Sequence, residues 1–237
     1  MCLCRRKNEY IDLGYENLAL IFVNTYARTL DSLKDGPVND GQMTYDGLTK
    51  LGYKPYLFKD VKRKRFKELM TTFLSAETKK LVIYFTGHGA SVKDKNGAAI
   101  IDSGEDSYRV NGDESDGYDE AFVFRDGIVL DDVVLNLIST FNKSKQLTII
   151  TDSCHSGSIC DLDDNKDILT ISAAHDKEEA MQVYFKKDKQ TCGCFTYYFW
   201  KYINENRDTK TLIPLINEKL QKYKHQCRCN HECDFIL

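Results

Sequence analysis

Continuous apolar runs alternate along this chain with stretches in which apolar residues recur every three or four positions. The runs LALIFV at 18–23 and LVIYF at 81–85 are apolar throughout, which is typical of strands buried on both faces of a sheet. Residues 61–76 instead show helical spacing, which predicts an amphipathic helix. This alternation predicts an α/β fold, with a mostly parallel sheet sandwiched between helices.

The same patterns locate the individual elements. The expected strands are 18–23, 54–58, 81–85, 146–151 and 168–172, and the expected helices are 41–51, 61–76, 130–141, 195–203 and 212–223. Asp40 stands directly before the first of these helices, where an aspartate serves as an N-cap. Residues 91–120 break the pattern and are acidic, which fits either a solvated loop or a cation site.

Composition and charge are those of an ordinary globular protein. The 237 residues include 42% apolar and 29% charged positions, with a net charge of −3. This charge provides no general field for nucleic acid, so none is expected as a partner. No apolar stretch nears the roughly 18 residues that cross a membrane. Residues 1–17 also lack the apolar core of a secretory signal, so we expect a cytoplasmic protein.

The nine cysteines are an odd number, and in the cytoplasm they are expected to be reduced. Cys2 and Cys4 stand beside the basic residues 5–7, where membrane association through lipid anchors is one alternative; we favour a frayed basic terminus. Cysteines and histidines also alternate with other residues over 225–233 and would share one face of a strand. Their spacing does not match common zinc sites, so a terminal strand is favoured there.

Two predicted strands end in reactive side chains. The strand 81–85 runs into Thr86, Gly87, His88 and Gly89, and the strand 146–151 runs into a segment that contains Cys154. Reacting groups in open parallel sheets collect beyond the carboxyl ends of the strands. If the two strands are neighbours, the imidazole and the thiol leave the same edge of the sheet.

This pair of groups suits nucleophilic catalysis. A thiolate is the reactive form of cysteine, and a nearby imidazole either lowers the thiol pKa or removes its proton during attack. Backbone N–H groups near Cys154 and Gly89 could then stabilise an oxyanion. A buried structural cysteine and a turn histidine are the alternatives. His155 is a second candidate base, but adjacent residues on a tight turn seldom point together.

The strings YFTGHGA at 84–90 and DSCHSG at 152–157 resemble the histidine and cysteine motifs of metacaspases, relatives of caspases in protists, fungi and plants. Other segments are similar in the same order: GPVND at 36–40, GDESDGYDE at 112–120, LDD at 130–132, ISAA at 171–174 and GCFT at 193–196. The resemblance is to a type I-like form and covers roughly residues 18–237. It implies a short N-terminal segment 1–17 and a caspase-like peptidase domain 18–237, with a large-subunit-like part 18–165 and a small-subunit-like part 166–237.

The resemblance implies a cysteine endopeptidase that cleaves after arginine or lysine, with His88 and Cys154 catalytic. Asp40 and Asp152 match acidic residues that line the family's basic-residue pocket, and Thr86 stands where a serine is common. Paired buried carboxylates would also favour a guanidinium or ammonium group. Either aspartate could instead cap its local element. Pro37 replaces the family's usual cysteine at the pocket rim.

The resemblance also implies calcium activation, because Asp119, Asp131, Asp132 and Asp161 match calcium-binding positions of the family. Carboxylate oxygens from several loops suit Ca²⁺. Asp131 and Asp132 could instead simply begin a helix, where negative charge is favourable. The spacer 126–130 is shorter than is usual in the family. No organic cofactor is expected.

Two rival functions remain open from the sequence. One is a legumain-like asparaginyl peptidase, whose motifs also pair a histidine–glycine step with a cysteine. The other is a non-catalytic regulatory or interaction module of the same fold. The intact His88 and Cys154 argue against the non-catalytic module, and the string DSCHSG at 152–157 favours a metacaspase over the legumain-like peptidase. We expect a monomer that acts on protein or peptide substrates.

Overall fold

The computed structural model describes residues 11–93, 118–139, 141, 145–154, 168–175, 178–234 and 236–237. Within these residues a central sheet is built from β1 (Asn17–Val23), β2 (Lys54–Lys59), β3 (Lys80–Thr86), β7 (Gln146–Asp152), β8 (Ile168–Ser172) and β11 (Arg228–Cys229). The strand order is β11-β8-β7-β3-β1-β2. All neighbouring pairs are parallel except β11 with β8, so the predicted mostly parallel sheet is confirmed.

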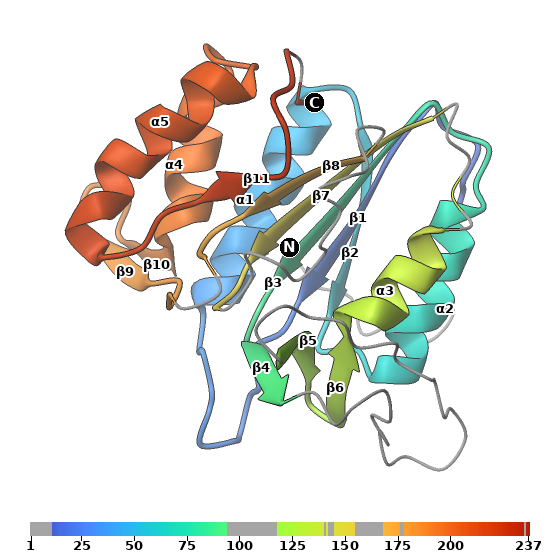
Figure 1. Cartoon of the computed structure of the whole chain (residues 1–237), viewed down its shortest axis with the longest axis horizontal. Helices are drawn as coiled ribbons and strands as arrows, with labels where there is room; N and C mark the ends of the chain where they lie inside the picture. The colour runs from blue at the N-terminus through green and yellow to red at the C-terminus, as the bar shows by residue number, and fades with distance from the viewer. Residues whose placement is uncertain are drawn as a thin grey trace.

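Helices cover both faces of this sheet, as the apolar runs predicted. They are α1 (Gly36–Lys50), α2 (Arg63–Leu74), α3 (Asp131–Ile138), α4 (Cys194–Tyr202) and α5 (Thr209–Leu220). Figure 1 shows α1, α4 and α5 on one face and α2 and α3 on the other. Alternate residues of β1 enter two separate cores: Phe22 packs with the side of α2, and Ile21 with the side of α4. A strand buried on both faces must be apolar at every position, which explains the continuous run.

Two smaller sheets lie beyond the carboxyl ends of the central strands (Figure 1). One contains β4 (Gly89–Lys93), β5 (Tyr118–Phe124) and β6 (Gly127–Leu130), and the other is the hairpin of β9 (Gln182–Phe185) and β10 (Gln190–Gly193). The prediction of a loop over 91–120 is therefore wrong at both ends, where 91–93 belong to β4 and 118–120 belong to β5. The error arose because antiparallel partners stabilise short polar strands whose own sequence pattern is weak. Residues 94–117 lie outside the described part of the chain.

The first helix begins five residues before its predicted start. Asp35 is the N-cap residue, and Pro37 lies in the first turn, where its missing N–H costs no helical hydrogen bond. Asp40 is thus inside the helix, and its interpretation as an N-cap is wrong. At the other end of the chain, α5 ends at Leu220 and a 3-10 turn, η1 (Gln221–Tyr223), completes the predicted helix.

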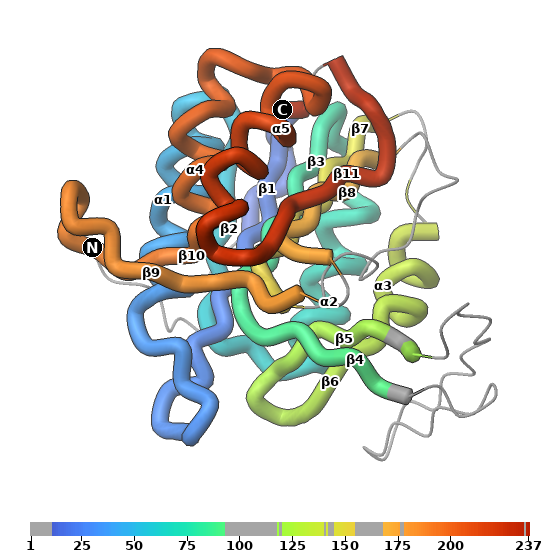
Figure 2. Tube along the Cα trace, turned by 60° about the vertical axis from the view of Figure 1, so that its left-hand side comes forward, coloured from blue at the N-terminus to red at the C-terminus, as the bar shows by residue number. Residues whose placement is uncertain are grey.

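The C-terminal segment closes one edge of the central sheet. Figure 2 shows it running beside β8, with which β11 pairs antiparallel over two residues. The described residues contain no group of three or more His, Cys, Asp or Glu placed to hold a metal ion. Among the same residues, no helix combines the length and apolar character needed to cross a membrane. The expected subunit boundary at residue 165 lies outside the described ranges.

Candidate active site

The sheet brings His88 and Cys154 to one edge. β3 and β7 are neighbours, and Thr86 at the end of β3 pairs with Asp152 at the end of β7. His88 and Cys154 each follow two residues after these paired positions. The N–H of Gly87 donates to the carbonyl oxygen of Asp152 at 3.3 Å, so the two chains stay together beyond the last sheet pair. The condition set by the sequence, that the two strands be neighbours, is met.

Gly89 is required by the close approach of these two chain ends. A Cβ placed on Gly89 would overlap the carbonyl oxygen of Cys154, a backbone atom that no side-chain rotation can move. The same Cβ would lie 3.3 Å from Oγ of Ser153. A glycine here therefore lets the histidine segment and the cysteine segment pack backbone against backbone.

A backbone oxygen orients the imidazole of His88. Nε2 of His88 lies 2.7 Å from the carbonyl oxygen of Asp31, in the loop that follows β1. A carbonyl oxygen only accepts, so Nε2 carries the proton in the neutral ring and Nδ1 is left as the base. The sequence did not identify Asp31, because a backbone oxygen is common to every residue type and leaves no compositional signal.

The thiol of Cys154 is half-buried and faces a second loop. Its sulfur lies 3.8 Å from the carbonyl oxygen of Ala180, and within the described residues this contact, rather than one with His88, is its hydrogen bond. Burial raises the pKa of the thiol, and the charges of Glu179 and Asp152 add to that shift. The raised pKa favours the neutral thiol. Of the two routes open from the sequence, this favours proton removal during attack over a preformed thiolate.

A buried carboxyl pair lies beside the reactive edge. Asp40 is fully buried on α1, where its Oδ1 accepts from the N–H of Gly193 at 2.8 Å and its Oδ2 accepts from Oγ1 of Thr86 at 3.2 Å. Oδ2 of Asp152 accepts from both the N–H and the hydroxyl of Thr196, at 3.2 and 2.5 Å. Gly193 contacts both aspartates. Its N–H donates to Asp40, and a Cβ on it would overlap the carboxylate of Asp152.

The two carboxyls of this pair hold protons unusually tightly. Burial, and then the charge of Asp152, raise the pKa of Asp40 well above its usual range. Burial also raises the pKa of Asp152, although the hydrogen bonds from Thr196 oppose that shift. Neighbouring buried carboxyls without a cation are costly to ionise, and a bound cation would offset that cost. The site thus combines two buried carboxyls whose ionisation a nearby positive charge would favour.

Residues 193–196 matched the family motif but were assigned no role from the sequence. Gly193 donates to Asp40 and leaves room for Asp152, while Thr196 donates twice to Asp152. His225 was likewise missed: it is fully buried, its Nδ1 lies 2.9 Å from the carbonyl oxygen of Ala173, and its charge lowers the pKa of Asp152. A histidine of this kind is recognisable only once the C-terminal segment is folded against β8.

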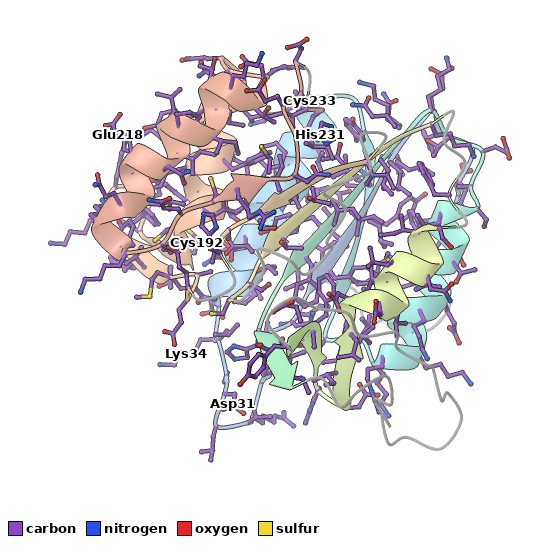
Figure 3. The ribbon with its side chains drawn as sticks, in the orientation of Figure 1. Asp31, Lys34, Cys192, Glu218, His231 and Cys233 are labelled. Atoms are coloured by element: carbon purple, nitrogen blue, oxygen red, sulfur yellow. The ribbon has the colours of Figure 1, made fainter. Side chains whose placement is uncertain are left out.

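Of the terminal Cys/His residues, His231 and Cys233 lie away from this site. Figure 3 shows His231 and Cys233 close together at the end of the molecule opposite Asp31, whose carbonyl orients His88. Only a short part of this segment is a strand, and His225 lies outside it. The interpretation as a terminal strand is therefore correct for Arg228–Cys229 alone.

A family model for the caspase domain, peptidase family C14, matches residues 16–234. The chain belongs to the caspase domain family. Among the curated relatives of this caspase domain, Metacaspase-1 of Yarrowia lipolytica is 38% identical over 87 residues, which cover 35% of this chain and 16% of that protein. Metacaspase-1 of Lodderomyces elongisporus is 29% identical over 167 residues, which cover 63% of this chain and 34% of that protein.

The chain thus spans no more than about a third of the length of either relative. The predicted likeness to metacaspases, and with it membership of a family of cysteine-type peptidases, is confirmed. A crystal structure of a Geobacter sulfurreducens protein matches this caspase domain with a TM-score of 0.64 at 17% identity, covering 86% of this chain and 89% of that chain. At that identity the likeness concerns the fold, and it confirms the α/β architecture.

The four aspartates predicted to bind calcium are only partly described. Asp131 is buried in the first turn of α3, and one of its carboxylate oxygens accepts from the N–H of Asp132 at 2.9 Å. Asp119 lies on β5 opposite Val92, with its side chain outside the described part of the structure, as is the whole of Asp161. Since β5 pairs with β6 directly before α3, three of the four positions share one end of this small sheet. Their oxygen donors suit Ca²⁺.

Asp40→Asn is expected to make the caspase domain more stable at neutral pH. An acid whose pKa is raised on folding binds more protons folded than unfolded, so its contribution to stability falls as pH rises above its unfolded pKa of about 4. The variant should therefore exceed the wild type by about 1–2 kcal/mol at pH 7, and this advantage should disappear towards pH 4. Urea unfolding across this pH range measures the difference.

Asp46→Asn, on the exposed side of the same helix, is the matched control and should change stability little at any pH. A variant Asp40→Asn that is less stable than the wild type by the same amount at every pH would contradict the expectation. It would mean that the hydrogen bonds to Gly193 and Thr86 outweigh the cost of the buried charge.

Proposed function

We propose that this chain is a cysteine endopeptidase that cleaves peptide bonds after arginine or lysine, with Cys154 and His88 as a catalytic dyad. The observation that carries this proposal is the pairing of β3 with β7, which delivers both residues to one edge beside a buried carboxyl pair. Membership of the caspase domain family supports the reaction class. The dyad is inferred from the residues, and the specificity and the activation by calcium from the resemblance of the motifs to those of metacaspases.

The protonation of the Cys154 thiol and of the His88 imidazole suits a two-step acyl transfer. Because the raised pKa favours the neutral thiol, Nδ1 of His88 is proposed to take the proton of Cys154 as the sulfur attacks the scissile carbonyl. The imidazolium then protonates the leaving amine, and the peptide bond breaks to leave a thioester on Cys154. The same nitrogen next removes a proton from water, which hydrolyses the thioester. Backbone N–H groups of Gly89 and Cys154 are proposed to stabilise the oxyanion in both steps.

The carboxyl pair supports the proposed specificity. Asp40 and Asp152 are both buried, and each already uses one or both of its carboxylate oxygens as a hydrogen-bond acceptor, so their geometry is fixed before a ligand arrives. A guanidinium or ammonium group entering between them would lower both raised pKa values and release a proton. Thr86 contributes by fixing Asp40 through its hydroxyl. An uncharged or acidic side chain would leave the charges uncompensated.

Calcium is part of the proposal as an activator. Asp119, Asp131, Asp132 and Asp161 would hold the ion through carboxylate oxygens, which hard cations prefer. When bound, the ion would supply positive charge that orders the segments carrying these residues. Asp119 lies on β5, which pairs with β4, and β4 begins at Gly89 directly after His88. A change at this end of the small sheet can therefore reach the histidine segment.

Purified protein should be assayed with fluorogenic peptides ending in Arg, Lys, Asn or Asp, at graded Ca²⁺ concentrations. The proposal expects turnover of Arg and Lys peptides that rises with Ca²⁺. The rate should fall in acid as the dyad takes up protons. Turnover of Asn peptides without calcium would instead support a legumain-like peptidase. Absence of both peptide turnover and self-cleavage would support a non-catalytic module.

A further inference from the structure

Tyr26 has a single side chain that contacts both the backbone and the ring of His88. Its hydroxyl accepts a hydrogen bond from the N–H of His88 at 2.7 Å and donates one to the carbonyl oxygen of Val123 at 2.8 Å. Its ring packs on the imidazole, with the ring centroids 4.5 Å apart and the planes inclined by 36°. The tyrosine therefore restrains where the histidine backbone runs and how the imidazole is tilted.

The hydroxyl is well matched to this position. Burial raises the pKa of Tyr26, so the phenol keeps its proton and can donate to Val123 while it accepts from His88. The N–H of Val123 in turn donates to the carbonyl oxygen of His88 at 3.1 Å. Tyr26 and Val123 together satisfy both backbone groups of the histidine, whose N–H and C=O are thereby held between two elements.

The backbone of Tyr26 is held in an unfavourable conformation. Its φ is +52°, in the left-handed region that residues other than glycine rarely adopt. Such a conformation persists only where the surroundings determine it, and it is frequent at functional sites. The carboxylate of Asp60, at the end of β2, accepts from both the N–H and the hydroxyl of Thr25, at 2.7–3.0 Å. Tyr26 itself accepts at its carbonyl from the N–H and hydroxyl of Thr29.

The loop that carries Tyr26 also carries the second contact to the ring. The carbonyl of Asp31 accepts from Nε2 of His88 at 2.7 Å. The same loop therefore contacts the imidazole at its face, through the ring of Tyr26, and at its edge, through the carbonyl of Asp31. The N–H of Leu33 donates to the carbonyl of Thr25 at 3.0 Å, which ties the two ends of this loop together. Figure 3 shows Asp31 on this loop, at the carboxyl end of the sheet.

We infer that Tyr26 is a positioning residue of the dyad: through its hydroxyl and its ring it fixes His88 so that Nδ1 can take the proton of Cys154, and Asp60 holds Tyr26 in place. This inference rests on the proposed function. It assigns Tyr26 no contact with substrate. Loss of the hydroxyl should slow the chemical step and leave substrate binding intact.

Tyr26→Phe tests the inference, because it removes the hydroxyl and keeps the ring. The kcat for an Arg peptide should fall about 10- to 100-fold with KM nearly unchanged, since small displacements of a catalytic base are costly. The rate of Cys154 alkylation by iodoacetamide should also fall near neutral pH and approach that of His88→Ala. Asp60→Asn, which loosens the hold on Thr25 without touching Tyr26, should give the same changes in smaller degree.

Tyr53→Phe is the matched control, because Tyr53 is also a buried tyrosine but precedes β2 at the amino end of the sheet. It should leave kcat and alkylation unchanged. If Tyr26→Phe and Asp60→Asn both alkylate with the wild-type pH profile while His88→Ala does not, the inference is overturned and the dyad stands. If His88→Ala also alkylates like the wild type, the proposed dyad itself fails.

Discussion

Cys154→Ala should reduce hydrolysis of Arg and Lys peptides to the background rate, and His88→Ala should lower kcat by about 10²- to 10⁴-fold. In the proposed mechanism the cysteine supplies the bond to the acyl group, so nothing replaces it. The histidine only moves protons, so water can take over part of its role. Because burial raises the pKa of the thiol, Cys154 depends strongly on that base at neutral pH. Steady-state kinetics with fluorogenic peptides measures both losses.

The matched control for the nucleophile is Cys233→Ala. Cys233 is a partly buried cysteine, and Figure 3 places it at the opposite end of the molecule from Asp31. It should retain wild-type kinetics. Circular dichroism should show that all three variants fold. Substantial activity in Cys154→Ala would rule out a thioester mechanism, and equal activity of His88→Ala and wild type would remove His88 from the mechanism.

Asp152→Asn should abolish the preference for basic residues while sparing the chemical step. Removing one charged partner of a buried, hydrogen-bonded ion pair costs about 2–5 kcal/mol, so kcat/KM for Arg peptides should fall by about 30-fold to several thousandfold. The amide oxygen of asparagine can still accept from Thr196, which preserves the local fold. The ratio of kcat/KM for an Arg peptide to that for an uncharged peptide isolates this effect.

Asp188→Asn, in the exposed turn between β9 and β10, is the control for loss of one negative charge and should leave that ratio unchanged. The wild-type KM for Arg peptides should also rise in acid, because the raised pKa values of Asp40 and Asp152 mean that both are protonated more readily than ordinary aspartates. If Asp152→Asn lowers kcat/KM equally for charged and uncharged peptides, Asp152 does not determine specificity.

The sequence predicted the central sheet well because its signal is local. A strand covered on both faces must be apolar throughout, and Leu18–Val23 and Leu81–Phe85 satisfy this within six and five consecutive residues. The strands β4 and β5 escaped prediction because they depend on antiparallel partners rather than on their own pattern. The N-cap of α1 was misplaced because an aspartate five residues earlier has the same local preference.

The candidate site likewise contains residues that the sequence predicted and residues that it did not. Side-chain identity and strand-end position predicted His88 and Cys154 as candidates, because reactive groups in parallel sheets collect at the carboxyl edge, whereas Asp40 and Asp152 became candidates through the resemblance to metacaspase motifs. Tyr26, the carbonyl of Asp31 and the hydroxyl of Thr196 could not be predicted from the residues, because each contributes through contacts with segments distant in the sequence. A tyrosine or a backbone oxygen has no distinctive chemistry until a particular partner lies within 3 Å.

The amino-acid sequence by itself therefore determined the fold class and the reactive groups, since both follow from residue type and short-range spacing. Only the tertiary structure decided which groups share an edge of the sheet, which nitrogen of His88 faces a backbone acceptor, and that burial raises the pKa of Asp40, of Asp152 and of the Cys154 thiol. Burial and hydrogen bonding are properties of contacts between distant segments. They cannot be read from neighbouring positions along the chain.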